Sequence, residues 1–185
     1  DAAGFAGYCC VGPVANDQSG PREGLNTTAI VRTSKFENAR ATGGAMYVGA
    51  GLVGHITTQA VVDQLISRNN HGEMGSTGGG AVCNVPSIVT RSRFEYNVAG
   101  AGGGLALGGT GAHTVRQCSF IGNIGMTHGG GVSYGSDGPL SISSTKFIMN
   151  EVRLAGDALN SIPELQVPII VYTADTGVGA SAPAP

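Results

Sequence analysis

The chain has 185 residues, the size of a single domain, and we expect it to fold around one hydrophobic core. Glycine supplies 32 residues and charged residues only 12%, which excludes an ordinary helical enzyme, while an apolar share of 41% excludes a disordered chain. A net charge of −2 offers no basic face to a phosphate backbone, so we expect no nucleic-acid partner.

The N-terminal residues 1–28 contain no repeat and are expected to form a cap over the edge of a terminal coil. Asn26-Thr27-Thr28 is an N-glycosylation sequon, typical of a surface loop in a secreted protein. The chain has neither the basic and apolar segments of a signal peptide nor a run of about 18 apolar residues. We therefore expect an extracellular or cell-surface location, no membrane insertion by this segment, and a chain that is either processed or cut from a longer one.

The cysteines are Cys9, Cys10, Cys83 and Cys118, an even set without a C-x-x-C pair. This pattern favours disulfides over zinc binding. We expect Cys9 or Cys10 to join the cap to the rest of the domain.

A first motif, an apolar residue followed within three positions by asparagine, occurs five times. The apolar members are Phe36, Ile66, Phe94, Phe120 and Phe147, and the asparagines are Asn38, Asn69, Asn97, Asn123 and Asn150. The apolar members are separated by 30, 28, 26 and 27 residues. A period of this length is typical of solenoids, and its drift indicates loops of variable length.

A second motif, a turn of small residues before an apolar residue, follows each copy of the first. Its turn glycines are Gly43, Gly44, Gly79, Gly80, Gly102, Gly103, Gly129 and Gly130, with Gly156 and Asp157 in the last copy. The apolar residues that follow are Met46, Val82, Leu105, Val132 and Leu159. We expect the glycines to adopt positive φ and to let adjacent coils approach closely.

The segments before the aromatic residues are rich in β-branched side chains and alternate in polarity, as in residues 30–36, 88–94 and 140–147. The frequent glycines would each cost a helix about 1 kcal/mol. We therefore predict an all-β fold, a right-handed parallel β-helix of five to six coils over residues 29–172. Residues 173–185, rich in Gly, Ala, Ser and Pro, are expected to form a tail or linker.

Equivalent residues of stacked coils lie about 4.8 Å apart and form ladders. The five apolar anchors are expected to form one internal stack, and Met46 with its equivalents a second. The five asparagines are expected to close a strand at a corner, with left-handed dihedrals and with amides bonded from coil to coil.

The repeated F-x-x-N and G-G-A-[ILV] motifs resemble those of the polymorphic outer membrane proteins of chlamydiae, over residues 29–160. The resemblance implies a secreted passenger β-helix that acts in adhesion at a cell surface, ahead of a membrane barrel. The chain departs from the family pattern at Phe36-Glu37-Asn38, which is one residue short, at Ile66, and at Gly156-Asp157-Ala158-Leu159.

Catalytic residues are not indicated. Glu37 and Glu95 are the only acidic residues that align between repeats, and we interpret them as solvated outward positions. The four histidines, at 55, 71, 113 and 128, share no ligand spacing, so we expect neither a metal nor a cofactor.

We therefore expect a non-enzymatic structural or adhesive module. Its partner would be a second copy, added end to end in a fibre or surface layer or packed side by side, or a cell-surface or glycan partner. The longest insertion, residues 70–77, is where a binding loop is expected. The alternative is a carbohydrate-binding or pectate-lyase-like β-helix, or a fragment of one.

Overall fold

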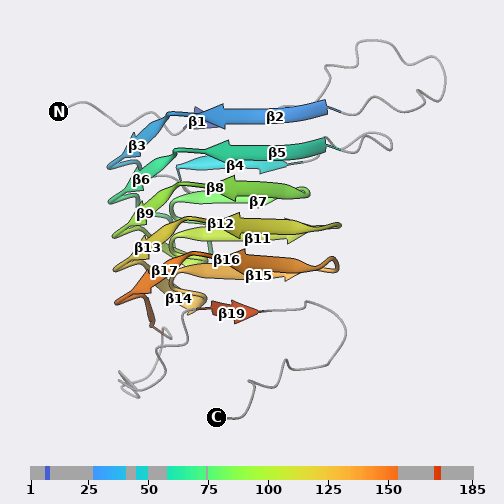
Figure 1. Ribbon diagram of the computed structural model, residues 1–185. Coiled ribbons are helices and arrows are strands. Elements are labelled where there is room, and N and C mark those ends of the chain that lie inside the picture. The colour runs from blue at the N-terminus through green and yellow to red at the C-terminus, as the bar shows by residue number, and fades with distance from the viewer. Residues whose placement is uncertain are drawn as a thin grey trace, which may run out of the picture.

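The computed structural model describes residues 7–8, 27–40, 45–49, 58–73, 75–153 and 169–171. These residues form a parallel β-solenoid, and no helix occurs among them (Figure 1). The predicted fold class is confirmed. The solenoid has about four turns, fewer than the five to six expected, and the predicted cap, the tail and Asn26 lie outside the described residues. Across the described ranges, no helix is long and apolar enough to cross a membrane.

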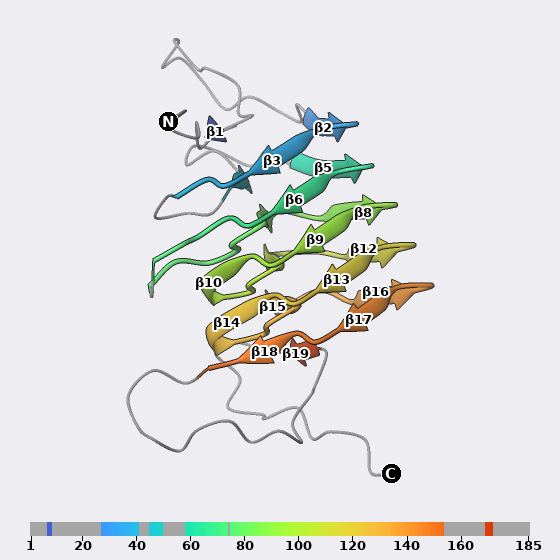
Figure 2. The same ribbon diagram turned by 90° about the vertical axis from the view of Figure 1, so that its left-hand side faces the viewer.

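Two five-stranded sheets, B and C, run the length of the solenoid (Figure 2). Sheet B contains β2 (Thr27–Arg32), β5 (Thr58–Asp63), β8 (Ser87–Thr90), β12 (His113–Arg116) and β16 (Leu140–Ser143). Sheet C contains β3 (Lys35–Glu37), β6 (Ile66–Arg68), β9 (Arg93–Glu95), β13 (Ser119–Ile121) and β17 (Lys146–Ile148). We number the coils one to five by these five strands of sheet C, and the chain makes four full turns between the first of them, β3, and the last, β17.

Two further sheets, A and D, complete the cross-section (Figures 1 and 2). Sheet A contains β1 (Gly7–Tyr8), β4 (Met46–Gly49), β7 (Ala81–Asn84), β11 (Leu105–Gly109), β15 (Val132–Ser136) and β19 (Ile169–Val171). Sheet D contains β10 (Val98–Ala101), β14 (Ile124–His128) and β18 (Glu151–Val152). All strand pairs of the described residues are parallel, so each coil adds one strand to each sheet that it enters.

Single residues in the left-handed region make the corners on either side of sheet C. The corner between sheets B and C holds Thr33, Gln64, Arg91, Gln117 and Ser144, and the corner between sheets C and D holds Asn38, Asn69, Tyr96, Gly122 and Met149. Their φ values lie between 46° and 60°. A single residue in this conformation turns the chain sharply, and side chains other than Asn and Gly adopt it only at a cost.

The aromatic ladder is confirmed for the last three coils and corrected in coil two. Phe94 and Phe120 are fully buried, with parallel rings and centroids 4.9 Å apart, and Phe147 follows Phe120 at 5.0 Å. In coil two the strand register pairs Phe36 and Phe94 with Ser67, not with Ile66. Because side chains alternate along a strand, Ile66 lies on the outer face and is 37% exposed.

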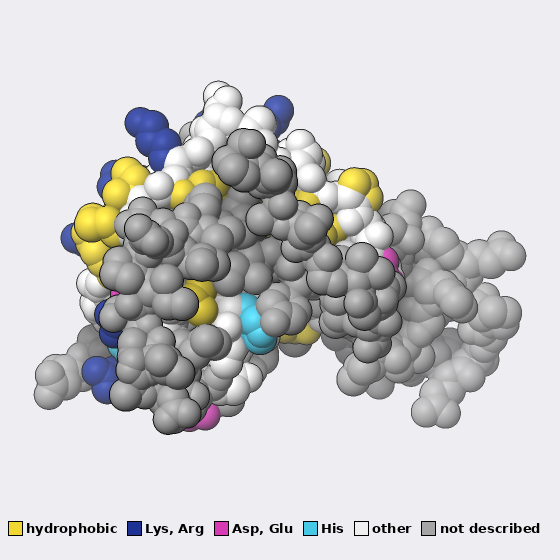
Figure 3. Space-filling model, turned by 90° about the horizontal axis from the view of Figure 1, so that it is seen from below, with side chains coloured by type: hydrophobic (Ala, Val, Ile, Leu, Met, Phe, Trp, Pro, Cys, Tyr) yellow, Lys and Arg dark blue, Asp and Glu magenta, His cyan; other side chains and the backbone are white. Residues whose placement is uncertain are grey.

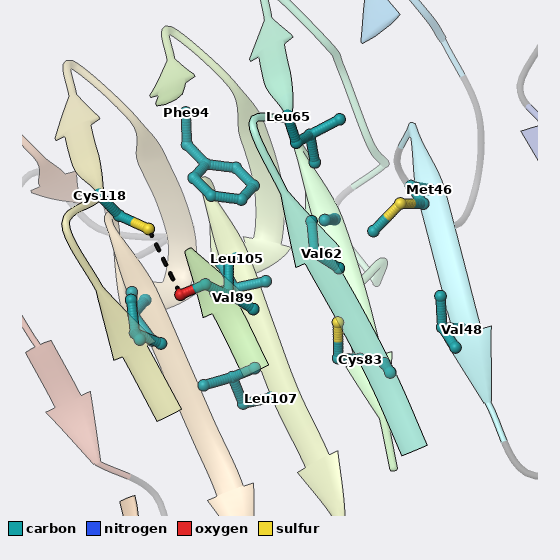
Figure 4. Close-up of a cluster of buried hydrophobic side chains, with 14 of the residues drawn as sticks. Met46, Val48, Val62, Leu65, Cys83, Val89, Phe94, Leu105, Leu107 and Cys118 are labelled. Atoms are coloured by element: carbon teal, nitrogen blue, oxygen red, sulfur yellow. Dashed lines mark hydrogen bonds between the residues drawn. The ribbon is translucent and has the colours of Figure 1, made fainter. Parts of the chain in front are cut away.

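The second apolar stack is also corrected by one residue. Met46, Leu105 and Val132 occupy one register position, but the member of that row in β7 is Ala81, since Val82 pairs with Tyr47 and Ala106. Leu159 lies outside the described residues, and Ile169 pairs with Val132 in its place. The core continues with the inward row of Val48, Cys83, Leu107 and Tyr134 (Figure 4).

The asparagine ladder runs through Asn70, Asn97, Asn123 and Asn150. Each Oδ1 from Asn97 onward accepts hydrogen bonds from the backbone N–H and the Nδ2 of the ladder asparagine one coil earlier, at 2.9–3.1 Å. The expected bonding between amides is therefore confirmed for Asn97, Asn123 and Asn150. The expected left-handed dihedrals are confirmed for Asn38 and Asn69 but wrong for these three, because the corner residue lies one position before the ladder. Asn38 and Asn69 are corner residues and not ladder members, so their expected amide bonding is wrong, and Ala39 takes the ladder position in coil one.

The turn glycines have two roles, positive φ and close approach of the next coil, and different glycines fill them. Gly102 and Gly129 have positive φ, as expected, together with Gly78, which sequence analysis missed. The other four described turn glycines, Gly79, Gly80, Gly103 and Gly130, have no positive φ but lie against the next coil. A Cβ on Gly80, for example, would come within 2.9 Å of the Phe94 ring. Gly43 and Gly44 lie outside the described residues.

Candidate functional site: the outer face of sheet C

The outer face of sheet C is a flat surface built from two rows of side chains and the adjoining corner row. The first row holds Lys35, Ile66, Arg93, Ser119 and Lys146, and the second holds Glu37, Arg68, Glu95, Ile121 and Ile148. The corner row, as above, ends in Tyr96, Gly122 and Met149. The side chains between these rows point inward and form the core, and they are the ones that the repeat motif specifies. The outward side chains, which the motif does not specify, determine the charge and polarity of this face.

Charged side chains occupy the half of this face that belongs to coils one to three. Lys35 Nζ lies 2.9 Å from Glu37 Oε2, and Arg68 lies between two carboxylates, 3.9 Å from Glu37 and 3.9 Å from Glu95. Arg93 also pairs with Glu95. Glu37 and Glu95 align in register on the outer face, but Arg68 of coil two separates them. The expectation of a solvated position is wrong for Glu95, which is only 8% exposed because these cationic side chains cover it.

Apolar side chains occupy the other half of the face, in coils four and five. Ile148 is 43% exposed and Met149 is 65% exposed, and Ile121 lies next to Ile148 in register. Tyr96 is 50% exposed, and its ring lies across Gly122, where a Cβ would come within 2.7 Å of it. A glycine at this corner thus lets an aromatic ring extend toward the apolar half of the face.

A view onto the end of the solenoid at coil five also shows exposed apolar side chains close together (Figure 3). Figure 3 views this end, with the side of β17 on the left. Hydrophobic side chains gather on that rim, with Lys and Arg side chains beside them (Figure 3). Exposed apolar area that is contiguous and bordered by charge is typical of contact surfaces, whereas single exposed apolar residues need no explanation.

One ion pair at the neighbouring corner shows how charged groups there are neutralised. Arg91 donates to both carboxylate oxygens of Asp63, with Nε at 2.8 Å, and Thr90 Oγ1 donates to Asp63 Oδ1 at 2.8 Å. The hydrogen bond from Arg91, followed by that from Thr90, lowers the pKa of Asp63 to about 2. This carboxylate therefore stays ionised, and a general-acid role would need the opposite shift.

Cys83 and Cys118 are buried free thiols, so the disulfide prediction is wrong for these two. Cys83 lies in the apolar core, where burial raises its pKa to about 12. The Cys118 Sγ lies 3.3 Å from the Arg116 carbonyl oxygen and 3.6 Å from that of Val89, so its one hydrogen is shared between two acceptors, and burial raises its pKa too. Figure 4 draws the contact with Val89. A thiol with a raised pKa is a poor nucleophile. Cys9 and Cys10 lie outside the described residues.

His71 and His113 lie in different sheets of the solenoid. His71 forms bridges with Arg40 and Val98 at the edge of sheet D, whereas His113 is buried in the core with Nδ1 2.8 Å from Ser87 Oγ. Nowhere in the described ranges do three His, Cys, Asp or Glu side chains come together as a metal site would require. His55 lies outside those ranges.

The insertion at residues 70–77 is hydrogen-bonded to the next coil of the solenoid at both of its ends, which was not expected. Asn70 belongs to the asparagine ladder, and His71 and Thr77 form parallel bridges with Val98 and Ala101 of β10. Ser76 is also buried. The flanks of this segment thus continue sheet D, and the expectation of a protruding binding loop is not met for them.

Sequence reasoning missed the residues that dominate the outer face of sheet C, namely Arg68, Tyr96, Ile121, Ile148 and Met149. All of them follow an inward residue by one or two positions. The signal that would have found them is the alternation around each phenylalanine, read for its outward members. No known protein family, curated protein or solved structure matches this chain.

Proposed function

We propose that this chain is a non-enzymatic, extracellular structural or adhesive module that binds a surface partner through the outer face of sheet C. The observation that carries the proposal is the exposed apolar area of Tyr96, Ile148 and Met149 beside a ladder of ion pairs. An apolar area bordered by charge provides binding energy at its centre and orientation at its rim.

The acidic residues of this face support binding rather than catalysis. Glu37 and Glu95 each contact two cationic side chains, and Arg68 lies between them. Among the described residues, Arg68 separates the two carboxylates, so neither has an adjacent carboxylate with which to divide acid and base roles. The pectate-lyase-like alternative therefore gains no support from these positions.

The motif resemblance to chlamydial polymorphic outer membrane proteins supports the same proposal in a finer form. In this form the chain is a passenger β-helix displayed at a cell surface. The structure explains the motif physically: Phe fills the core, Asn bonds from coil to coil, and Gly admits the aromatic ring of the next coil. These constraints act on the fold alone, so the adhesive specificity of any such protein would come from the outward residues.

Seamless end-to-end stacking is disfavoured by the asparagine ladder. Within the solenoid, each ladder residue donates to the Asn Oδ1 of the following coil. If coil one of a second copy stacked beneath coil five, the N–H and Nδ2 of Asn150 would face Ala39, which has no side-chain acceptor. Asn150 Nδ2 keeps its hydrogen bond to the Phe120 carbonyl at 2.9 Å, but its second hydrogen and the backbone N–H would lack the Oδ1 acceptor found at the earlier steps of the ladder, at about 1–3 kcal/mol each. We therefore favour a surface partner over a fibre of directly stacked copies.

The proposal is tested by measuring adhesion of the fluorescently labelled chain to cultured epithelial cells. The double variant Ile148→Gln/Met149→Gln removes two adjacent exposed apolar side chains of the face, and we expect binding to fall about fivefold or more. The matched control is Ile30→Gln/Ile88→Gln, which makes the same kind of change on the outer face of sheet B.

Three results would contradict the proposal: no adhesion of the unaltered chain, equal losses in both double variants, or turnover of polygalacturonate that Glu37→Gln or Glu95→Gln abolishes. Circular dichroism and unfolding temperatures of all variants show whether the solenoid is intact. Electron microscopy of the unaltered chain tests the fibre directly.

A further inference from the structure

A second surface lies at the corner between sheets B and C, in coils four and five. It consists of Arg116, Gln117 and Ser119 from one coil and of Ser143, Ser144 and Lys146 from the next. We call these six residues the corner strip. Ser119 is partly exposed and the other five are exposed. Arg116 pairs in register with Ser143, and Ser119 with Lys146, so the strip is continuous across the two coils.

The cations of the corner strip differ from Lys35, Arg91 and Arg93 of the earlier coils in having no ion-pair partner. Arg32 and Arg40 of coil one have none either among the described residues, but Arg32 lies in register with Asp63. Lys35, Arg91 and Arg93 are each paired with a carboxylate. Among the described residues, no carboxylate lies within 4.0 Å of Arg116 or Lys146. The sequence has no Asp or Glu between Glu95 and Asp137, and none between Asp137 and Glu151. Two adjacent coils therefore present cations without local neutralisation.

Hydroxyl and amide groups surround these two cations. Ser119, Ser143 and Ser144 supply hydroxyls, and Gln117 supplies a carboxamide that can donate and accept. No hydrogen bond from these four side chains occurs within the described structure, so their polar groups face water. Unpaired positive charge among uncharged donors and acceptors matches a ligand that carries both anionic groups and hydroxyls.

We propose that the corner strip binds an anionic polysaccharide laid along the solenoid axis. Arg116 and Lys146 would pair with sulfate or carboxylate groups, and the serine hydroxyls and Gln117 would bond sugar hydroxyls. The strip contains no aromatic side chain. Single-stranded nucleic acids are held mainly by stacking of bases on aromatic rings, so a glycan fits this surface better.

The inference deepens the proposed function, since an anionic glycan is a component of the surfaces that an adhesive module would meet. It rests on that function only in this choice of ligand. The corner strip shares Ser119 and Lys146 with the outer face of sheet C, but it contains none of the apolar side chains Tyr96, Ile121, Ile148 and Met149. The variants that test the two proposals therefore change different residues, and the proposals can fail separately.

The experiment is binding of the full chain to four immobilised probes at about 0.15 M salt: heparin, polygalacturonate, neutral dextran and oligo-dT. Heparin carries sulfates and polygalacturonate carries carboxylates, so the two arms separate the sources of negative charge. We expect binding to at least one of them, weakening as salt is raised, and no binding to dextran. Arg116→Ser/Lys146→Ser should weaken that binding about tenfold or more.

The control is Arg40→Ser/Arg153→Ser, which removes the same net charge at the edge of sheet D. We expect it to retain binding within about twofold. The proposal is overturned if neither anionic glycan binds, if the control loses as much as the corner-strip variant, or if oligo-dT binds as tightly as the glycans. Heparin binding without cell adhesion would remove the proposed function and leave this site, and cell adhesion without glycan binding would do the reverse.

Discussion

Coil two and coils three to five fill the same space with different side chains. In coils three, four and five, the left-handed residue of the corner between sheets B and C is followed by Ser92, Cys118 and Thr145, respectively. A phenylalanine of sheet C comes two positions after each of these. Coil two reverses this order, with Leu65 at the corner and Ser67 in the aromatic ladder, both fully buried. What recurs from coil to coil is therefore the buried volume and the satisfied hydrogen bonds, and the residue type at a given position can change.

The hydrogen bonds of coil two show why the exchange is tolerated. Ser67 Oγ donates to the Gly80 carbonyl at 3.0 Å and accepts from Asn70 Nδ2 at 2.9 Å. Ser92 Oγ of the next coil accepts from the Leu65 backbone N–H at 3.1 Å. Each of these two buried hydroxyls thus has a partner, which avoids the cost of burying an unsatisfied polar group.

The largest effect is expected from Phe120→Ala, at the centre of the continuous aromatic stack. The ring lies between Phe94 and Phe147, with interplanar angles of 4° and 7°. Its removal should lower the free energy of unfolding by about 3–5 kcal/mol, measured by urea denaturation. Phe147→Ala, at the partly exposed end of the stack, should cost less, and equal costs would show that the stack is not the centre of the core.

Asn97→Ala should cost about 3 kcal/mol, because it removes the Oδ1 that accepts from the N–H and Nδ2 of Asn70. Asn69→Ala is the comparison, since Asn69 is an exposed corner residue with φ of 53°. There alanine should cost only about 1 kcal/mol of left-handed strain. If thermal or urea unfolding ranks Asn69 above Asn97, the ladder assignment is wrong.

The exchange in coil two is tested by a double-mutant cycle with Leu65→Ser and Ser67→Phe. The first change alone leaves a cavity, and the second alone crowds Leu65 and removes a partner of Asn70. Together they restore the order of coil three. We expect the pair to be more stable than the sum of the single effects by about 2 kcal/mol. Strict additivity would contradict the idea that the two positions share one volume.

The smallest effect concerns His113, which replaces an apolar residue in the inward row of sheet B. Ser87 contacts its Nδ1, the Tyr134 ring packs edge-on to it at 5.8 Å, and Nε2 is buried without a partner. Cys83, whose pKa burial raises and Ser87 lowers to a smaller extent, is the other titratable group nearby. Burial lowers the pKa of His113 below its ordinary 6.5, because it disfavours the charged imidazolium.

The unfolded chain therefore binds a proton at a higher pH than the folded chain does. Stability that is complete above about pH 6.5 should fall as the pH drops below that value. The decline should be smaller in His113→Leu, which matches Leu140 one strand further along. Urea unfolding at about pH 7.5 and about pH 5 measures the difference, and an unchanged pH dependence in the variant would exclude His113 as its source.

The repeat was readable from the sequence because its strongest signals are backbone constraints. In coils three to five asparagine follows phenylalanine by three positions, as Asn123 follows Phe120, and this offset carries the chain from the core around one corner. Coil two misled sequence analysis because its motif, Ile66-Ser67-Arg68-Asn69-Asn70, offers two apolar-to-asparagine alignments. Only the strand register, which pairs Ser67 with Phe36 and Phe94, distinguishes them.

The candidate binding surfaces were less predictable. Arg68 and Glu95 are distant in sequence and meet only because their strands pair, so a search for clustered charges along the chain misses them. The exposed Tyr96 depends on the absence of a side chain at Gly122 in the next coil. Both features are contacts between residues of adjacent coils, and the sequence of one repeat alone does not reveal them.

Both proposed binding surfaces require that the register of sheet C turns their side chains outward, and cross-linking measures this register directly. Lys35 and Ile66 are register partners on the outer face. Neighbouring Cα atoms in such a pair lie about 4.8 Å apart, within the range that a disulfide spans. The variant Lys35→Cys/Ile66→Cys should therefore form a cross-link under mild oxidation, identified by peptide mass spectrometry. In the register that the motif alone suggests, Ile66 would stack on Phe36 inside the coil. Absence of the cross-link in this variant, together with its formation in Phe36→Cys/Ile66→Cys, would contradict the account.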